Sequence, residues 1–292
     1  MGEGEVLTAI AKIGAVVFVV GSLLSMGLSF TLSQLITPLK NARLVIVVLI
    51  ANFIVVPAFA WGITEVLPLD DELAYGLIIL GCVAGAPFIP KEVQAAKGNL
   101  AAGVAVMFLL MVVTIVYAPI VLPWILEGAE VSGWDLASSL IMSMAIPLAL
   151  GLVLKASFPD DAPEWAALAG KASGLGGVAL IGIGLVLQIR NIFGLIGSWG
   201  FLALAVFVLG SLVVGYFSGG GDAGMRKVTG LGTAQRNVAA ALVVATVSFP
   251  ETLTVTYILI AALLLPVIPI PIAKWLAGRT EADSESATAP AS

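Results

Sequence analysis

Three charged residues lie deep inside apolar segments of this chain. Lys91 and Glu92 belong to the run GCVAGAPFIPKEVQAAKGN (81–99), and Arg236 belongs to VTGLGTAQRNVAAALVVA (228–245). At about 1.5 Å per helical residue, Arg236 lies roughly 13 Å and Lys91 roughly 10 Å from the nearer end of its segment. A lysine or arginine at the centre of a bilayer costs about 2.5–3.5 kcal/mol. We therefore expect polar groups or water around both cations.

Two interpretations of these charges remain open. In one, Glu92 and Arg236 form a buried ion pair that locks the two segments together. In the other, Lys91 and Arg236 line a water-filled cavity and attract an anion, because two cations and one carboxylate leave a net positive charge. The other residues that we expect to bind the substrate are Pro87, Gln94, Thr233, Gln235 and Asn237. Asn52 is expected to contact the site from the neighbouring span.

Both segments are interrupted. The run Ala84-Gly85-Ala86-Pro87, followed by Pro90, cannot continue a regular helix, and Gly230 and Gly232 loosen the second segment. We expect new helix N-termini near residues 89–91 and 234–236, where free N–H groups favour an anion. Interrupted apolar segments at corresponding places in two halves point to the binding site of a secondary transporter. Ordinary kinked helices in a packed bundle are the alternative.

The composition predicts an integral membrane protein. Hydrophobic residues make up 60% and charged residues 11% of the chain, against about 25% charged in soluble domains. About nine segments have the length of about 20 residues that a bilayer requires. These predicted spans are 6–30, 43–67, 73–97, 100–126, 135–155, 166–188, 197–217, 228–249 and 252–277. The expected fold is an all-α polytopic membrane protein in the lipid bilayer.

Several functions are excluded by the residues that the chain lacks. It has no histidine, which removes imidazole metal sites and Ser-His-Asp catalysis. Its single cysteine, Cys82, fits no metal or disulfide pattern and is expected to be a small buried core residue. We predict no enzyme activity, no metal, no cofactor and no nucleic-acid partner.

The basic residues between spans predict the orientation. If about nine spans alternate, most lysines and arginines fall on one side, which is then cytoplasmic. These residues are Lys40, Arg43, Lys97, Lys155, Lys171, Arg226, Lys227, Lys274 and Arg279. Arg190, Lys12 and the acidic clusters (Glu65, Asp70, Asp71, Glu72; Glu127, Glu130, Asp135) fall on the other side. The N-terminus is predicted outside and the C-terminus inside, in a bacterial or archaeal plasma membrane, with residues 280–292 forming a disordered tail.

Four runs carry a resemblance to a known family. MGLSF (26–30), NFIVVP (52–57), the first interrupted segment and TAQRNVAAALVVA (233–245) resemble the bile acid:sodium symporter family, within the bile/arsenite/riboflavin transporter superfamily. The resemblance implies ten spans in two inverted repeats with two crossed, broken helices. This chain looks like a member without the first span, so we expect a four-span repeat at 1–130, a five-span repeat at 131–279 and the tail at 280–292.

The chain departs from the family at the positions that would bind sodium. At the first sodium site, the matching residues offer no side-chain oxygen: Ile89, Pro90, Gly103, Met107 and Gly232. At the second, Asn52 keeps an amide oxygen, but Gly232 replaces a glutamate and Arg236 replaces a glutamine. A guanidinium would repel sodium. We therefore predict a sodium-independent protein in which Lys91 and Arg236 replace the ions. Coupling is then absent or uses protons, with Glu92 or Lys91 as the titrating group.

The predicted function is alternating-access transport of a small organic anion, either a carboxylate or a bile-acid-like compound. The resemblance implies that a core bundle moves against a panel of helices and that Asn237 donates to a substrate oxygen. The alternative function is a non-transporting membrane sensor or structural homologue with decayed ion sites. Stabilisation by a carboxylate would separate the two.

Overall fold

The computed structural model describes residues 3–126, 132–187, 189, 197–250 and 252–288, and all regular structure in these residues is helical. This confirms the predicted all-α polytopic membrane fold. The first half contains α1 (Glu3–Ser29), α2 (Leu32–Ile36), η1 (Thr37–Lys40), α3 (Ala42–Ile50), η2 (Ala51–Val55), α4 (Val56–Val66), α5 (Asp71–Cys82), α6 (Ile89–Ala95) and α7 (Leu100–Ile125). The second contains α8 (Gly133–Leu140), η3 (Ile141–Ala145), α9 (Ile146–Ser157), α10 (Ala162–Leu187), α12 (Gly200–Ser218), α13 (Ala223–Ala234), α14 (Val238–Ser248), α15 (Leu253–Val267) and α16 (Pro269–Thr288).

Seven continuous stretches of the described residues are long and apolar enough to cross a membrane. They are Ala9–Ser29, Ala42–Val66, Leu100–Ile125, Gly133–Ser157, Ala162–Gly184, Gly200–Ser218 and Leu253–Gly278. Each coincides with a predicted span. The other two predicted spans, 73–97 and 228–249, are the pairs α5 with α6 and α13 with α14, whose members are too short to cross alone. A total of about nine crossings stays a prediction.

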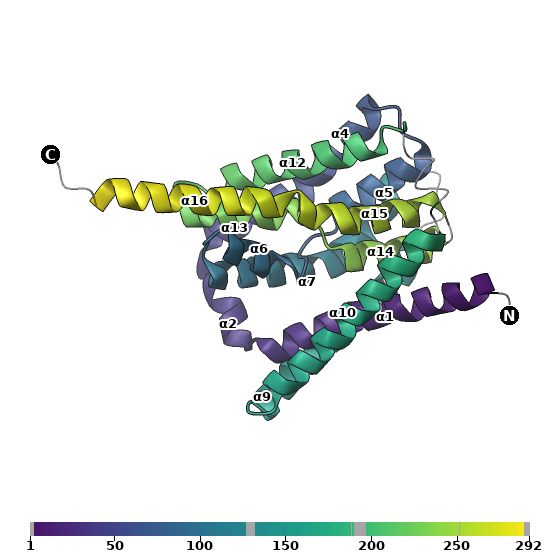
Figure 1. Cartoon of the computed structure of the whole chain (residues 1–292), viewed down its shortest axis with the longest axis horizontal. Coiled ribbons are helices and arrows are strands. Elements are labelled where there is room, and N and C mark those ends of the chain that lie inside the picture. The colour runs from purple at the N-terminus through teal and green to yellow at the C-terminus, as the bar shows by residue number, and fades with distance from the viewer. Residues whose placement is uncertain (1–2, 127–131, 188, 190–196, 251, 289–292) are drawn as a thin grey trace.

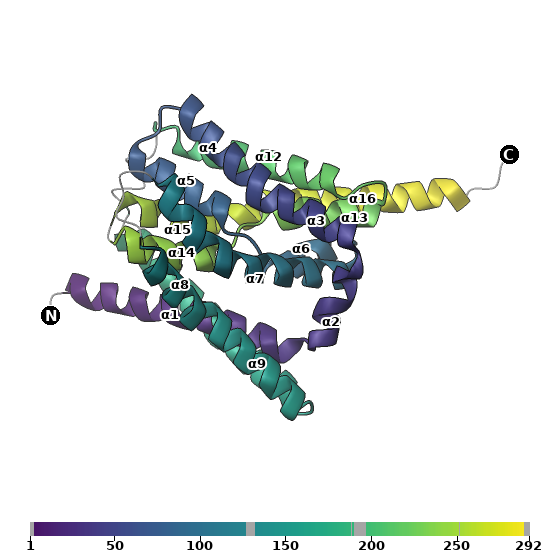
Figure 2. The ribbon, with the colours of Figure 1, turned by 180° about the vertical axis from the view of Figure 1, so that it is seen from behind.

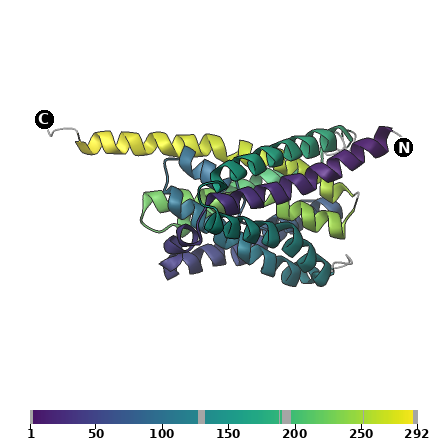
Figure 3. The ribbon, with the colours of Figure 1, turned by 90° about the horizontal axis from the view of Figure 1, so that it is seen from below.

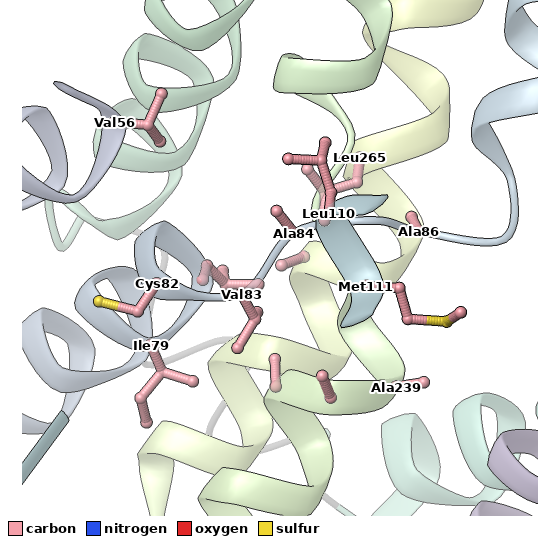
Figure 4. Packing of buried hydrophobic residues seen from close by; sticks show 14 of the residues in the cluster. Val56, Ile79, Cys82, Val83, Ala84, Ala86, Leu110, Met111, Ala239 and Leu265 are labelled. Carbon is pink, nitrogen blue, oxygen red and sulfur yellow. The ribbon is translucent and has the colours of Figure 1, made fainter. Parts of the chain in front are cut away.

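The helices form two groups. In Figures 1 and 2, α1, α9 and α10 lie apart from most of the other helices, and we call them the panel helices. Figure 3 shows α1 and α10 running side by side. The core helices are α4 to α7 and α12 to α16. A hydrophobic cluster fills this group and extends to the panel helices, and Figure 4 shows part of it, including Cys82, Val83 and Ala84. Cys82 is fully buried, as predicted.

Small residues let the panel helices approach closely. A Cβ added at Gly27 would lie 2.4 Å from the carbonyl oxygen of Leu148 in α9, and one at Gly14 would lie 2.9 Å from that of Gly176 in α10. The hydroxyl of Ser25 donates to the Ala166 carbonyl at 2.7 Å. Close backbone approach with small and hydroxyl side chains is the usual way in which membrane helices associate.

In the span formed by α3, η2 and α4, Pro57 leaves a backbone carbonyl that a partner from α7 satisfies. Proline cannot donate to the carbonyl four residues earlier, which belongs to Phe53. The hydroxyl of Tyr117 in α7 donates to that carbonyl at 2.7 Å. This bond holds α7 against η2, the segment that carries Asn52.

One end of the molecule carries basic residues that entered the prediction of orientation. Figure 1 shows α2, the start of α13 and the far part of α16 at one end, and the start of α1 at the other. The first end carries Lys40, Arg226 and Lys227, which belong to the side predicted to be cytoplasmic. Arg190, Glu127 and Glu130, which entered the prediction of orientation, lie outside the described residues.

The prediction of a disordered tail at 280–292 stays a prediction. Helix α16 continues to Thr288, so residues 280–288 are helical, and residues 289–292 lie outside the described part. The segment EADSESAT contains good helix formers such as alanine and glutamate.

Candidate functional site

The first break is an extended segment between α5 and α6. Helix α5 ends at Cys82 and α6 begins at Ile89, as the prolines predicted. Gly85 has φ of +81°, and a Cβ there would lie 2.2 Å from the Met111 amide nitrogen of α7. Only glycine fits this conformation and this approach.

Thr114 of α7 satisfies the backbone of the first break. Its hydroxyl accepts from the Ala84 amide at 2.9 Å and donates to the Ala84 carbonyl at 3.1 Å. The sequence analysis missed Thr114. The available signal was a buried hydroxyl in an otherwise apolar helix, because such a group needs a partner.

The second break lies slightly later than predicted. Gly230 and Gly232 remain inside α13, which ends at Ala234, and α14 begins at Val238 rather than near 234–236. The side chain of Asn237 sets this start, because its oxygen accepts from the Ala240 amide at 3.1 Å as an N-cap. Its amide nitrogen donates to the Gly85 carbonyl at 3.3 Å. Asn237 therefore joins the two breaks.

Arg236 is completely buried, with 0% of its surface exposed, and it ties the second break to the end of α5. Its Nε donates to the Leu80 carbonyl at 2.9 Å, and Nη2 donates to the Gly81 carbonyl at 2.7 Å. Its Nη1 donates to Asn52 Oδ1 at 2.8 Å and to the Thr233 carbonyl at 3.1 Å. The last carbonyls of a helix lack partners within that helix and attract a cation. The guanidinium thus caps α5.

Asn52 completes this cluster from η2. While its oxygen accepts from Arg236, its Nδ2 donates to the Val48 carbonyl and to Thr233 Oγ1, both at 3.0 Å. Three backbone carbonyls and one amide oxygen thus surround the guanidinium. Several neutral or anionic oxygens are what a hard metal cation requires, and here an arginine occupies their centre. Four of its five N–H donors are already engaged, which leaves little capacity for a substrate anion.

Glu92 is separate from this cluster. It is 1% exposed, and its Oε1 accepts from the Gln235 amide at 3.3 Å in the orientation that also lets Gln235 donate to the Leu265 carbonyl at 3.0 Å. Within the described chain, Glu92 Oε2 has no hydrogen-bond partner. The structure does not form the ion pair between Glu92 and Arg236, because the guanidinium bonds to the α5 carbonyls instead.

The structure does not bring Lys91 or Gln94 into the cluster. Both side chains are exposed on α6, and Lys91 Nζ lies 5.5 Å from the centre of the Phe88 ring. The rotation of α6 turns Glu92 and Val93 inward instead. Lys91 therefore lies apart from Arg236 in this structure, and its role in binding an anion stays a prediction. Pro87 lies half-buried within the first break.

Lys227 takes a role that the sequence analysis missed. It is 4% exposed, and its Nζ donates to the Ala96 carbonyl at 2.8 Å, where α6 ends. We had assigned it to the cytoplasmic edge because it follows Arg226 at a span boundary. Two cations of the second broken segment therefore cap the C-termini of the two helices of the first, which is the favourable end for positive charge.

A cavity of about 320 Å³ lies between panel and core helices. Its walls are almost entirely apolar and come from α1, η3, α10, α14 and α15, with Lys12 as the charged residue that lines it. Representative wall residues are Val16, Val19, Leu180, Leu242 and Leu259. An apolar cavity with few polar groups is typical of a site for a small organic ligand. The described residues hold no cluster of three or more Cys, Asp or Glu side chains for a metal.

Comparison with known proteins gives a family and two relatives. The model of the sodium bile acid symporter family matches residues 16–199. An uncharacterized sodium-dependent transporter of Bacillus subtilis (strain 168), YocS, is 30% identical over 138 residues, which are 46% of this chain and 42% of the relative. The probable chloroplastic sodium/metabolite cotransporter BASS2 of Oryza sativa subsp. japonica is 29% identical over 139 residues, 47% of this chain and 33% of the relative. The matches thus span less than half of either relative. All three names describe transporters and none an enzyme, in agreement with the sequence analysis.

Proposed function

We propose, because this chain belongs to the sodium bile acid symporter family, that it is a secondary transporter of a small organic anion. The names of the relatives support solute transport. The two broken, crossing segments support it as well, because discontinuous helices in a membrane protein are typical of transporter binding sites. The observation that carries the choice of an organic anion is the apolar cavity lined by Lys12 between panel and core helices.

The cavity favours a ligand with an apolar body and one negative charge. Its walls would bury hydrocarbon, at about 25 cal/mol per Å², while the Lys12 ammonium would attract a carboxylate. The cavity lies between the two helix groups, so movement of the core helices against the panel helices would expose the ligand to each side in turn. A carboxylate or a bile-acid-like anion has this chemistry.

We further propose that transport does not require sodium. The Arg236 guanidinium lies among four oxygens that would otherwise suit a bound cation. Its positive charge is permanent under physiological conditions, and it is covalently attached. The buried cluster therefore has its cation at all times, and external sodium has no place at these oxygens.

Thermal unfolding of the purified protein tests both parts. Pyruvate, 2-oxoglutarate and cholate are each added in sodium chloride and in choline chloride at equal ionic strength. We expect at least one anion to raise the unfolding temperature by the same amount in both salts, since binding to the native state stabilises it. Stabilisation by sodium itself would refute sodium independence. No stabilisation by any of the anions would favour a non-transporting homologue.

A matched pair of variants places the ligand. Lys12→Gln removes the ammonium from the cavity, whereas Lys155→Gln removes one at the exposed end of α9. We expect Lys12→Gln to weaken the stabilising anion about tenfold, equivalent to about 1.4 kcal/mol, and Lys155→Gln to leave its affinity unchanged. Equal affinities in both variants would move the ligand out of this cavity.

A further inference from the structure

Glu92 is the one acidic side chain among the buried residues that the structure describes. One of its oxygens accepts a hydrogen bond from Gln235, and the other has no partner in the described chain. An ionised carboxylate in such a place loses its hydration without gaining compensating bonds. The neutral acid avoids most of this cost.

The cations that the structure describes near Glu92 are directed elsewhere. Helix α6 packs against α7, α13 and α16, and α7 contains no charged residue. On α13, the side chain of Arg226 donates to the Gly220 carbonyl and that of Lys227 to the Ala96 carbonyl. Among the described side chains of α16, Lys274 is exposed.

The remaining charges belong to α6, its C-terminal end and the second break. On α6, Lys91 is exposed, and Lys97 is also exposed just beyond the end of this helix. Arg236 binds the carbonyls of α5 and the oxygen of Asn52. Glu92 forms no ion pair with any of these cations in the residues that the structure describes. Nothing in this arrangement holds the carboxylate in its ionised form.

We infer that Glu92 is a proton-binding site and that the core helices rearrange only when the proton is bound. This inference rests on the proposed transport function. The hydrogen bond from Gln235, the first residue after α13, places Glu92 against the second break, so a movement of α6 past this break changes the surroundings of the carboxyl group. A core with an ionised Glu92 would have to carry an unpaired carboxylate through an apolar interior.

The proton step balances without any further reactant. When the rearranged core exposes Glu92 to water, the O–H bond of the carboxylic acid breaks, the proton passes to water and a carboxylate remains. The reverse step takes one proton from hydronium before the side chain is buried again. No electron transfer is involved. Exchange of substrate across the membrane should therefore become faster as the pH falls.

Infrared spectroscopy of the purified chain in lipid nanodiscs tests the site without any substrate. We expect the C=O band of a protonated carboxyl group at neutral pH, where a carboxyl group in water is ionised. Glu92→Gln should remove this band, and Glu65→Gln should leave it. Gln235→Leu should shift the band to higher frequency, because it removes the bond to Oε1, and it provides a second assignment if Glu92→Gln does not fold. Absence of the band from the wild type overturns the inference.

Exchange in liposomes tests the consequence for transport. Radiolabelled pyruvate or cholate is exchanged across the membrane over a range of pH. We expect wild-type exchange to fall at least tenfold from acidic to alkaline pH and the exchange by Glu92→Gln, which mimics the neutral acid, to stay constant. An unchanged pH profile in Glu92→Gln overturns the role in rearrangement. If the wild type exchanges neither anion, the proposed function fails for these substrates, while the infrared band still decides whether Glu92 binds a proton.

Discussion

Arg236 shows how one side chain can hydrogen-bond to several groups of both broken segments at once. Its guanidinium serves two carbonyls at the end of α5, one in α13 and the amide of Asn52. A lysine could not reproduce this, because its ammonium lacks the planar fork. The cost of burying the charge is offset only when all of its bonds form. The two broken segments are therefore held together at a single residue.

Loss of Arg236 should strongly destabilise the protein. Arg236→Met leaves the Leu80 and Gly81 carbonyls without this partner, and each unpaired buried group costs about 1–3 kcal/mol. We expect a large drop in the thermal unfolding temperature, with a smaller drop for Arg236→Lys. Arg43→Met, at an exposed position of α3, is the control and should unfold like the wild type. Equal stability of Arg236→Met would contradict the capping role.

A double variant should create a response to sodium. Arg236→Gln removes the tethered cation, and Gly232→Glu adds a carboxylate where the related family has one. A Cβ at Gly232 would lie 3.6 Å from Val106 Cγ1, an ordinary contact, so a side chain can begin there. We expect sodium, and not choline, to raise the unfolding temperature of Gly232→Glu/Arg236→Gln. No difference between the two salts would mean that these oxygens do not form a cation site.

The sequence predicted which residues of the second break are buried, but not every partner. Depth along a segment follows from residue counting, and this placed Arg236 correctly in the interior. The direction in which Lys91 points depends on the rotation of α6 about its axis. The extended segment before α6 sets this rotation, and counting residues cannot predict it. Lys227 was missed for a different reason. A lysine at a span boundary usually reaches water, and only the tertiary position of Ala96 gives it a buried partner.

At the scale of helices, the sequence predicted the first break more accurately than the second. Proline has a direct steric effect on the backbone, so the start of α6 at Ile89 was predictable. Glycine only permits a break. Gly230 and Gly232 therefore stay helical within α13, and α14 starts where Asn237 can cap it. Asn237 was predicted to donate to a substrate. In this structure it caps α14 and donates to the Gly85 carbonyl, and its contact with substrate stays a prediction.

Gly85 should be the least replaceable glycine of the first break. Gly85→Ala places a Cβ 2.2 Å from a backbone nitrogen of α7 and forces an alanine to φ of +81°. We expect loss of the folded protein or a large fall in unfolding temperature, measured by fluorescence-detected size exclusion during heating. Gly182→Ala is the control, because its Cβ meets nothing within 4 Å on α10. It should be neutral or stabilising, by up to about 1 kcal/mol. Similar behaviour of the two variants would argue against the close crossing of the first break and α7.

At the scale of the molecule, the order of elements resembles a repeat. In both halves a long helix precedes a further span, a broken pair and a final long span: α1 to α7 in the first half and α10 to α16 in the second. This order supports the predicted inverted repeats at 1–130 and 131–279, which stay a prediction. The grouping of α1 with α9 and α10 could not be predicted from residue patterns, because small residues that pack helices occur on most spans.

The placement of the termini gives the last prediction. An odd number of crossings puts the two termini on opposite sides, and in Figure 1 the start of α1 and the far end of α16 lie at opposite ends of the molecule. The basic residues between spans predict that the α16 end is cytoplasmic. In cells that express a Cys82→Ala background, we expect a membrane-impermeant maleimide to label Glu65→Cys, at the end of α4, in intact cells. Lys40→Cys, at the end of η1, should be labelled only after permeabilisation, since both positions are exposed but lie at opposite ends. The reverse pattern would invert the orientation, and labelling of both positions in intact cells would mean that the span formed by α3, η2 and α4 does not cross the membrane between them.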